Sequence, residues 1–320
     1  MRDIIAIKMS NKMKKVLVVI FSIIMTVALS ACGSTSQDID NNDSPDTLTI
    51  LCADFPEYDW VKNIVDGSNY FSVELLNDSG ADLHSFQPSV SDIAKICDCN
   101  ILIYNGGESE SWIGEAWENN SRSFRVAINL MKVFQESPMF PEYEDNDDEH
   151  LWLSPRLAKE FCGVICDVIK TFDSQNVDIY DANYVKYANE LSLLETSYSE
   201  LKLSYPVLIA DRMPFNYLFE DCGIECYAAF DGCSAETEAS FETIVDLANV
   251  IINNNLKTVF YLDGSTDEIA QSVIQASEVS DVETKVLNSL QSISKEDISS
   301  GVDYISIMKE NLDILKTLEG

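Results

Sequence analysis

The sequence predicts an α/β protein with two similar lobes joined by one long helix. Three observations support this prediction. Short apolar runs rich in β-branched residues alternate with segments of helical periodicity, which is typical of βα units and largely parallel sheets. These runs fall into two groups of four, and a stretch without glycine or proline separates the groups. Within that stretch the apolar side chains recur at spacings of three and four, as along one face of a helix.

The eight predicted strands set the boundaries of the two lobes. The first four are Leu48–Cys52, Phe71–Leu76, Asn100–Tyr104 and Phe124–Ile128. The last four are Pro206–Ala210, Ile224–Ala229, Thr258–Leu262 and Thr284–Leu287. We therefore expect an N-terminal α/β lobe over residues 47–175 and a C-terminal α/β lobe over residues 204–320.

The stretch between the lobes, residues 176–203, is predicted to be a single long helix. Its apolar stripe consists of Tyr180, Tyr184, Tyr187, Leu191, Leu194, Tyr198 and Leu201. At 1.5 Å per residue the stripe would extend roughly 35 Å, about the diameter of a small domain. A coiled-coil dimer seam is the alternative, but it needs flanking charge pairs and more heptads than this stretch contains. We expect a stiff connector within a monomer.

The N-terminus has the pattern of an export signal. A segment with several lysines precedes an apolar run, Val16 to Leu29, which is shorter than the roughly 20 residues needed to span a bilayer. The run ends in Leu29-Ser30-Ala31-Cys32, which resembles the bacterial lipobox. We expect a signal peptide over residues 1–31, a lipid on Cys32, and a disordered polar tether up to residue 46. The protein would then be extracytoplasmic and anchored to the membrane by the lipid on Cys32; an ordinary cleaved signal with an incidental cysteine is the alternative.

The charge balance excludes one class of partner. The chain has 54 acidic and 21 basic residues, a formal charge of −33. Nucleic acid is not expected as a partner, because its phosphates require lysine and arginine. A strongly negative field concentrates cations, but the same charge also keeps an exported protein soluble, so both interpretations stay open.

The cysteines give a weaker signal. With Cys32 lipidated, eight remain, and an even number outside the cell permits disulfides whose connectivity spacing does not reveal. Several lie inside apolar runs, where a buried thiol is the commoner role. Cys97 and Cys99 match neither a zinc knuckle nor a redox pair. We therefore do not predict a metal site built from cysteines.

The two histidines of the chain, His84 and His150, are the candidate ligands. Each lies in a loop at a predicted helix start, where open α/β sheets place their ligand sites, and each has carboxylates beside it. After His150, Ser154 is a plausible N-cap and Pro155 a plausible first helical residue. Lone histidines are more often surface or core residues, but a neutral imidazole is also the commonest side-chain ligand for zinc.

Longer motifs around these histidines resemble a known family. DLHSFQPSVSDI, followed by ILIYNGG and ESWI, is similar to D-P-H-x-Y-E-P-T-P-S-D and then L-x-x-Y-N-G-x-x-x-E-x-W. DEHLWLSPRLA resembles D-P-H-x-W-L-D-P-x-N-A, while DRMPFNYLFEDCGI, GCSAETEAS and YISIMKENLDIL look like the later conserved stretches. Together these are similar to the zinc and manganese substrate-binding lipoproteins of ABC transporters.

The resemblance implies two (β/α)4 lobes joined by one rigid helix, with a metal site between the lobes. It implies capture of Zn²⁺, or alternatively Mn²⁺, and delivery to an ABC permease and its ATPase without catalysis. His84 and His150 match the first two family ligands. The third falls on Arg212, which cannot coordinate a cation, so the adjacent Asp211 is the expected stand-in. An N-cap or an ion pair with Arg212 is the other role open to Asp211.

The fourth family ligand has no clear counterpart in this chain. The matching loop contains Asn288 and Gln291, whose carbonyl oxygens are weak zinc ligands. Asp263, Glu236 and Glu238 are acidic candidates from other loops of the second lobe. The expected site is therefore incomplete, with water in the fourth place.

An acidic run precedes His150 and consists of Glu142, Glu144, Asp145, Asp147, Asp148 and Glu149. It either collects cations or is simply a solvated loop. Two other functions stay open. Two histidines, a carboxylate and a water also describe a zinc hydrolase, although no HExxH motif is present. An adhesin or sensor lipoprotein of the same fold with a degenerate metal site is the other alternative.

Overall fold

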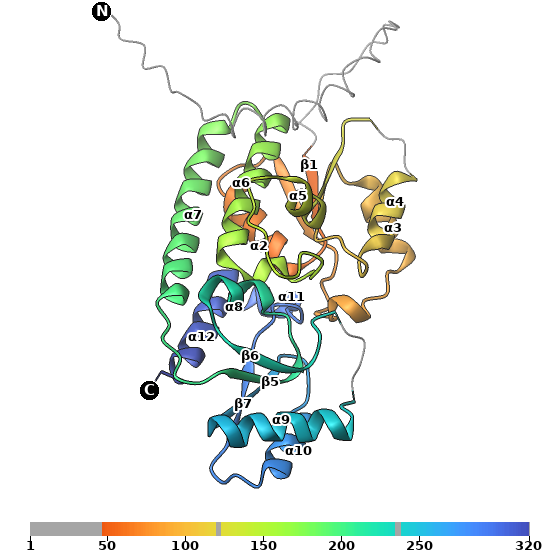
Figure 1. Ribbon diagram of the computed structural model, residues 1–320. Helices are drawn as coiled ribbons and strands as arrows, with labels where there is room; N and C mark the ends of the chain where they lie inside the picture. The colour runs from red at the N-terminus through yellow and green to blue at the C-terminus, as the bar shows by residue number, and fades with distance from the viewer. Residues whose placement is uncertain (1–46, 120–122, 234–237, 320) are drawn as a thin grey trace, which may run out of the picture.

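The computed structural model describes residues 47–119, 123–233 and 238–319 (Figure 1). The predicted signal peptide, Cys32 and the tether lie outside these described residues. The strands of the first lobe are β1 (Leu48–Cys52), β2 (Phe71–Leu75), β3 (Ile101–Tyr104) and β4 (Val126–Asn129). Those of the second lobe are β5 (Val207–Arg212), β6 (Cys226–Phe230), β7 (Thr258–Leu262) and β8 (Glu283–Leu287).

Within the described residues these strands form two four-stranded parallel sheets, ordered β2-β1-β3-β4 and β6-β5-β7-β8. The prediction of four plus four parallel strands is confirmed. Their ends differ from the prediction by a few residues. At the start of β4, for example, Phe124 has a φ of 62°, a left-handed conformation that a strand cannot contain, so pairing begins at Val126.

The helices of the first lobe lie on both faces of its sheet. They are α2 (Phe55–Val65), α3 (Val90–Asp98), α4 (Ser111–Glu118), α5 (Leu130–Glu136) and α6 (Pro155–Phe172), with short 3-10 turns η1 (Leu83–Ser85) and η2 (Leu151–Leu153). Alternate residues of β1 point to opposite faces: Leu51 packs with α3 and α4, whereas Ile50 packs with α2 and α6. A strand covered on both faces has no polar side, which explains the buried apolar run Ile50-Leu51-Cys52.

The second lobe repeats this arrangement. Its helices are α8 (Asn216–Cys222), α9 (Phe241–Asn254), α10 (Glu268–Ser277), α11 (Lys295–Ser299) and α12 (Tyr304–Lys316). Helices α9 and α10 cover one face of the sheet, where Leu208 and Val259 are buried. The opposite face, with Ile209 and Phe260, belongs to the same apolar core as the inner face of the first lobe.

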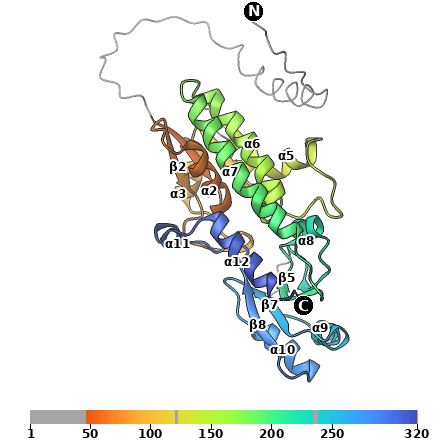
Figure 2. The ribbon, with the colours of Figure 1, turned by 90° about the vertical axis from the view of Figure 1, so that its left-hand side faces the viewer.

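The long helix α7 (Val177–Ser199) links the two halves (Figure 2). Its predicted stripe packs inward against α6, α2 and α12, and Tyr180, Tyr187 and Tyr198 are almost completely buried. The three tyrosine hydroxyls donate hydrogen bonds to Asp173, Asp59 and the carbonyl of Met308. A single long helix therefore connects the two lobes, which fits the prediction, and this helix packs against both of them.

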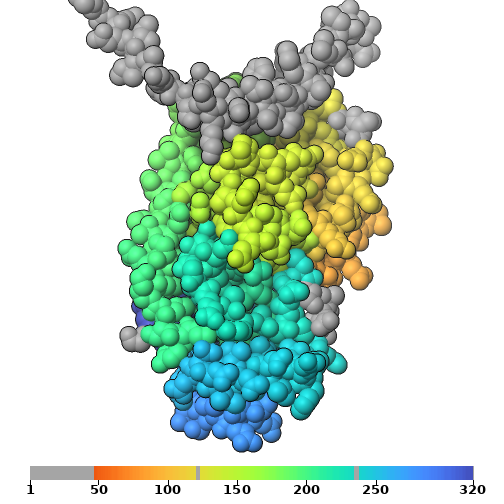
Figure 3. Space-filling view, viewed as in Figure 1, coloured from red at the N-terminus to blue at the C-terminus, as the bar shows by residue number. Residues whose placement is uncertain are grey.

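The two lobes meet along a broad front (Figure 3). The segment after His150 is central to it. The indole nitrogen of Trp152 donates to the carbonyl of Ser289 at 2.9 Å, and the hydroxyl of Tyr304 donates to the carbonyl of Trp152 at 2.6 Å. The carboxyl ends of the two sheets consequently face each other, and this is where the candidate ligands lie. None of the described helices is long and apolar enough to cross a bilayer.

Candidate metal centre

His84 is held by the loop that follows β2. It lies in the middle of η1, where Asp82 caps the turn by accepting a hydrogen bond from the backbone amide of His84 at 2.9 Å. The imidazole Nδ1 lies 2.9 Å from the hydroxyl oxygen of Ser109. With Nδ1 occupied in this way, Nε2 is the ring atom that faces His150.

His150 is the residue immediately before η2, and it is completely buried. Asp148 accepts hydrogen bonds from the backbone amide of His150 at 2.9 Å and from its Nδ1 at 2.6 Å. The amide nitrogen of Asn216, from α8 of the second lobe, donates to the other oxygen of Asp148. A carboxylate bound to Nδ1 fixes the tautomer of a histidine and leaves the Nε2 lone pair available to a metal.

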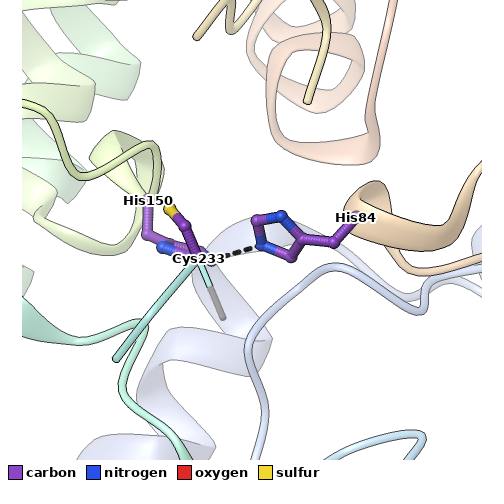
Figure 4. Close-up of side chains that lie close together, drawn as sticks. All are labelled: His84, His150 and Cys233. Carbon is purple, nitrogen blue, oxygen red and sulfur yellow. Dashed lines mark hydrogen bonds between the residues drawn. The ribbon is translucent and has the colours of Figure 1, made fainter. Parts of the chain in front are cut away.

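The two imidazoles meet where the lobes join (Figure 4). Their Nε2 atoms are 3.2 Å apart, and a third donor, Cys233 from the loop after β6, lies beside His150. One ligand atom from each of the three residues lies within 4.8 Å of the others. Among the described residues this is the one group of three such side chains that could hold a metal ion.

The electrostatic surroundings of the two histidines differ. Burial and the neighbouring His150 lower the pKa of His84 below its ordinary value. Burial also opposes a charge on His150, but the carboxylate of Asp148 outweighs it and raises the pKa of this imidazole to about 9. His84 is thus a neutral donor at pH 7, and a metal at His150 would displace the proton on Nε2 while Asp148 keeps its hydrogen bond to Nδ1.

The loop after β3 supports His84 from behind. Glu149 is buried, and its Oε1 accepts hydrogen bonds from the backbone amides of Glu108 and Ser109. The chain can approach Glu149 so closely only at a glycine: a Cβ on Gly107, whose φ is 80°, would lie 2.3 Å from Oε1. The acidic run before His150 is therefore divided in function. Asp148 and Glu149 are buried and support the two histidines, whereas the four other carboxylates of the run are exposed.

Arg212 lies at the end of β5, as the motif predicts, and binds Asp82 in the first lobe. Its Nη2 is 2.5 Å from Oδ2 and its Nη1 is 3.3 Å from Oδ1 of Asp82. Burial disfavours the charge of Asp82, but this ion pair holds the pKa of Asp82 below its ordinary value. The residue at the third family position therefore bridges the lobes through the same carboxylate that caps His84.

Asp211, the expected stand-in ligand, has other contacts. Its Oδ1 accepts a hydrogen bond from the backbone amide of Arg212 at 2.8 Å, and its Oδ2 accepts one from Leu262 at 3.3 Å. It does not belong to the group formed by His84, His150 and Cys233. These contacts join β5 to β7, so the geometry favours a structural role for Asp211, and its assignment as a ligand stays a prediction.

The candidates for a fourth ligand are only partly engaged, since Oδ2 of Asp263 and Oε1 of Gln291 are buried without a hydrogen-bond partner among the described residues. The side-chain oxygen of Asn288 accepts from the amide of Leu290, and Asp263 accepts from the amide and hydroxyl of Ser289. Gln291 is buried. Glu236 lies outside the described residues, and neither Glu238 nor the other candidates join the group of three.

Cavities lie on two sides of His84. One, of about 610 Å³, extends into the second lobe and is lined by Asp82, Asp211 and Asp263 together with Arg212. The other, of about 560 Å³, lies over the first lobe and includes Cys233 in its wall. A hydrated cation could therefore reach His84 from either side, and a site formed there would keep a position open to water.

The sequence motifs do not identify Cys233 as a candidate ligand. It lies in a polar loop, and its spacing to the other cysteines is uninformative. One signal could have identified it: it closely follows the predicted strand Ile224–Ala229, at the sheet edge where ligand sites occur.

The sequence is similar to proteins of zinc uptake and zinc binding. The family described as "Zinc-uptake complex component A periplasmic" matches residues 50–318. High-affinity zinc uptake system protein ZnuA of Bacillus subtilis is 30% identical over 302 residues, or 90% of this chain and 92% of that protein. Zinc-binding lipoprotein AdcA of Streptococcus pneumoniae is 26% identical over 320 residues. That match covers 95% of this chain but 61% of AdcA.

Solved structures share the fold. The metal-dependent lipoprotein YcdH of Bacillus subtilis superposes with a TM-score of 0.70 at 28% identity, over 85% of this chain and 100% of that chain. The Zn(II)-bound ZnuA-like domain of Streptococcus pneumoniae AdcA gives a TM-score of 0.70 at 25% identity, over 85% of this chain and 99% of that domain. The laminin-binding protein Lmb of Streptococcus agalactiae gives 0.71 at 22% identity, over 85% and 100%, which shows a likeness of fold alone.

Proposed function

This chain belongs to the family of periplasmic zinc-uptake complex component A proteins, and we propose on that basis that it captures Zn²⁺ outside the cytoplasm for an ABC importer. Zinc is the cargo, and the protein holds it between the lobes until an importer receives it. His84 and His150 are the proposed ligands from the first lobe.

The observation that best supports this proposal is the distance of 3.2 Å between the two Nε2 atoms. Two imidazole nitrogens that bind one tetrahedral zinc at about 2.0–2.1 Å are about 3.3 Å apart. The rings therefore need little rearrangement to bind the same ion. Their Nδ1 atoms are already occupied by Ser109 and Asp148, as is usual for histidines that bind metal.

We propose that the partners are an ABC permease and its ATPase, and that a lipid on Cys32 keeps the protein at the outer face of the membrane. A protein retained there releases its cargo close to the permease. Replacing Cys32 by alanine should move the protein from the membrane fraction into the soluble fraction, and it should abolish labelling by a fatty acid. Unchanged fractionation and labelling would contradict the anchor.

We further propose that the protein is not an enzyme. The donors of the site bind and release an ion. Of the carboxylates nearest to the histidines, Asp148 has both oxygens hydrogen-bonded, and Glu149 has Oε1 bonded to backbone amides. Both side chains are almost completely buried, so they are poorly placed to activate a water as a hydrolase requires. The alternative of an adhesin gains only a likeness of fold from the laminin-binding protein Lmb, and its sequence identity of 22% supports nothing further.

Zinc titration of the purified protein tests the central proposal. Wild type should bind one Zn²⁺, and His84→Ala and His150→Ala should each bind it at least about tenfold more weakly, or about 1.4 kcal/mol. Gln87→Ala, an exposed change in the loop of His84, is the control. Competition with a chromophoric chelator gives the affinities. Equal and weak binding by wild type and both histidine variants would overturn the proposal.

A further inference from the structure

The second lobe brings no histidine to the centre, since both histidines of the chain lie in the first lobe. Arg212, at the position where relatives have a third ligand, is occupied by its ion pair with Asp82. Asp211 binds two backbone amides. Among the described residues, Cys233 is the residue of the second lobe that joins the two histidines in a group able to hold a metal.

The loop that carries Cys233 is pressed against His150. A Cβ on Gly232 would lie 2.5 Å from the carbonyl oxygen of Met213, 3.2 Å from Nδ1 of His150 and 3.3 Å from Oδ2 of Asp148. Real Cβ atoms do not come as close as 2.5 Å, so the loop reaches this position only because residue 232 has no side chain. The absence of a side chain at Gly232 thus allows the thiol of the next residue to lie beside the imidazoles (Figure 4).

Taking the proposed role of His84 and His150 as given, we infer that the thiolate of Cys233 is the ligand of the second lobe and makes the site select Zn²⁺ over Mn²⁺. Binding replaces the S–H bond by a metal–sulfur bond, and the proton leaves to solvent; no electron is transferred. Two imidazoles, one thiolate and one water complete a four-coordinate site.

The selectivity follows from the donor atoms. Thiolate is a soft ligand that suits zinc, whereas manganese prefers carboxylate, carbonyl and water oxygens. At usual bond lengths, of about 2.3 Å to sulfur and about 2.0–2.1 Å to nitrogen, sulfur and nitrogen ligands on one tetrahedral ion are about 3.6 Å apart. The group of ligand atoms, all within 4.8 Å of one another, is compact enough for this arrangement after a small movement. The carboxylate oxygens of Asp211 and Asp82, which would favour manganese, are already bound to backbone amides or to Arg212.

Cobalt provides a direct test, because Co²⁺ bound to a thiolate absorbs strongly in the near ultraviolet through sulfur-to-metal charge transfer. The reduced, purified protein is titrated with Co²⁺ alone. Wild type should develop this absorption at one equivalent, and Cys233→Ser should lose it. Cys226→Ser, which removes a half-buried thiol of the same lobe, should keep it.

Affinity for the two metals gives the second readout. Cys233→Ser should weaken Zn²⁺ binding by about tenfold or more while changing Mn²⁺ binding by less than about threefold, so the ratio of the two affinities falls. Cys233 is exposed, so the substitution should leave the thermal unfolding of the metal-free protein unchanged. The inference is overturned if wild type binds cobalt without the absorption, or if Cys233→Ser keeps the zinc affinity of wild type.

These outcomes separate the two proposals. If the thiolate absorption is missing but His84→Ala and His150→Ala still lose zinc, the proposed function stands and the role of Cys233 falls. If neither histidine variant differs from wild type, the proposed function itself falls.

Discussion

The ion pair between Arg212 and Asp82 should contribute measurably to the stability of the closed arrangement. It joins the end of β5 to the turn that carries His84, and two nitrogen–oxygen contacts of 2.5 and 3.3 Å give it a bidentate geometry. The side chains are 17% and 24% exposed, so solvent screens the pair only in part. Replacing Arg212 by methionine and Asp82 by asparagine, singly and together, isolates their interaction in a double-mutant cycle.

The expected magnitude follows from this geometry. Two charges about 4 Å apart attract by about 4 kcal/mol at an effective dielectric constant of about 20. Desolvation and the ordering of two side chains offset most of this, and fully exposed pairs contribute only about 0.2–1 kcal/mol. A bidentate, partly buried pair should lie above that range, so we expect a coupling of about 1–2 kcal/mol.

Urea unfolding of the four metal-free proteins measures this coupling. The pair Lys316–Asp313, whose side chains are 46% and 75% exposed, is the control, and its coupling should be below about 0.5 kcal/mol. Raising the salt concentration should weaken the control more than the interlobe pair, because screening acts mainly on exposed charges. A coupling between Arg212 and Asp82 below about 0.3 kcal/mol, the error of additivity, would refute the reasoning.

Three further predictions follow from the contacts around the site and the core. Ser109→Ala should weaken zinc binding by about tenfold in a chelator competition, because His84 loses the contact that orients its ring. Asp211→Ala should change zinc affinity by less than about twofold but lower the free energy of unfolding by about 1–2 kcal/mol, since a buried backbone amide loses its acceptor. Burial raises the pKa of Asp59 from 3.8 to about 6, so the folded state binds its proton more tightly than the unfolded state. The contribution of this proton to the free energy of unfolding is complete below about pH 4, and it falls by about 3 kcal/mol as the pH rises through about 6. Urea unfolding at several pH values measures this decrease, and Asp59→Asn should abolish it.

Each of these variants has a matched control and an opposing result. Ser85→Ala, next to His84 and exposed, should bind zinc like wild type; equal affinities for this variant and Ser109→Ala would show that the serine contact does not orient the ring. Asp231→Ala, an exposed change in the same lobe, should leave stability unchanged. A tenfold loss of zinc affinity in Asp211→Ala would instead restore the carboxylate as a ligand. In Asp66→Asn the free energy of unfolding should depend on pH as in wild type. If this pH dependence also persists in Asp59→Asn, it arises from other carboxyl groups.

Much of the fold could be predicted because its elements have strong local patterns. Strand β3 has the sequence Ile-Leu-Ile-Tyr, and all four side chains are buried, so the apolar run directly reflects a strand covered on both faces. The stripe of α7 was equally readable, since a helix that packs on one side repeats its apolar residues with a fixed period. The positions of His84 and His150 at helix-start junctions were likewise visible in the sequence.

The second half of the candidate site could not be predicted in this way. Arg212 cannot bind a cation, but nothing in the sequence pairs it with Asp82, which belongs to the other lobe. Cys233 was one of eight cysteines without a distinguishing pattern. What distinguishes it is the packing of Gly232 against His150, a contact between segments that are far apart in the chain.

The sequence by itself determined the two sheets, the long helix, the family and the two histidines, because these depend on periodicity and on motifs of neighbouring residues. Only the tertiary structure decided which groups surround those histidines. In that structure Asp211 accepts hydrogen bonds from backbone amides, and Arg212 forms an ion pair across the lobes. Cys233 is the residue that lies beside His150. The physical reason is that the site forms where the carboxyl ends of two separate sheets meet. Distances across that junction are set by how the two lobes pack, and no local pattern in the sequence encodes them.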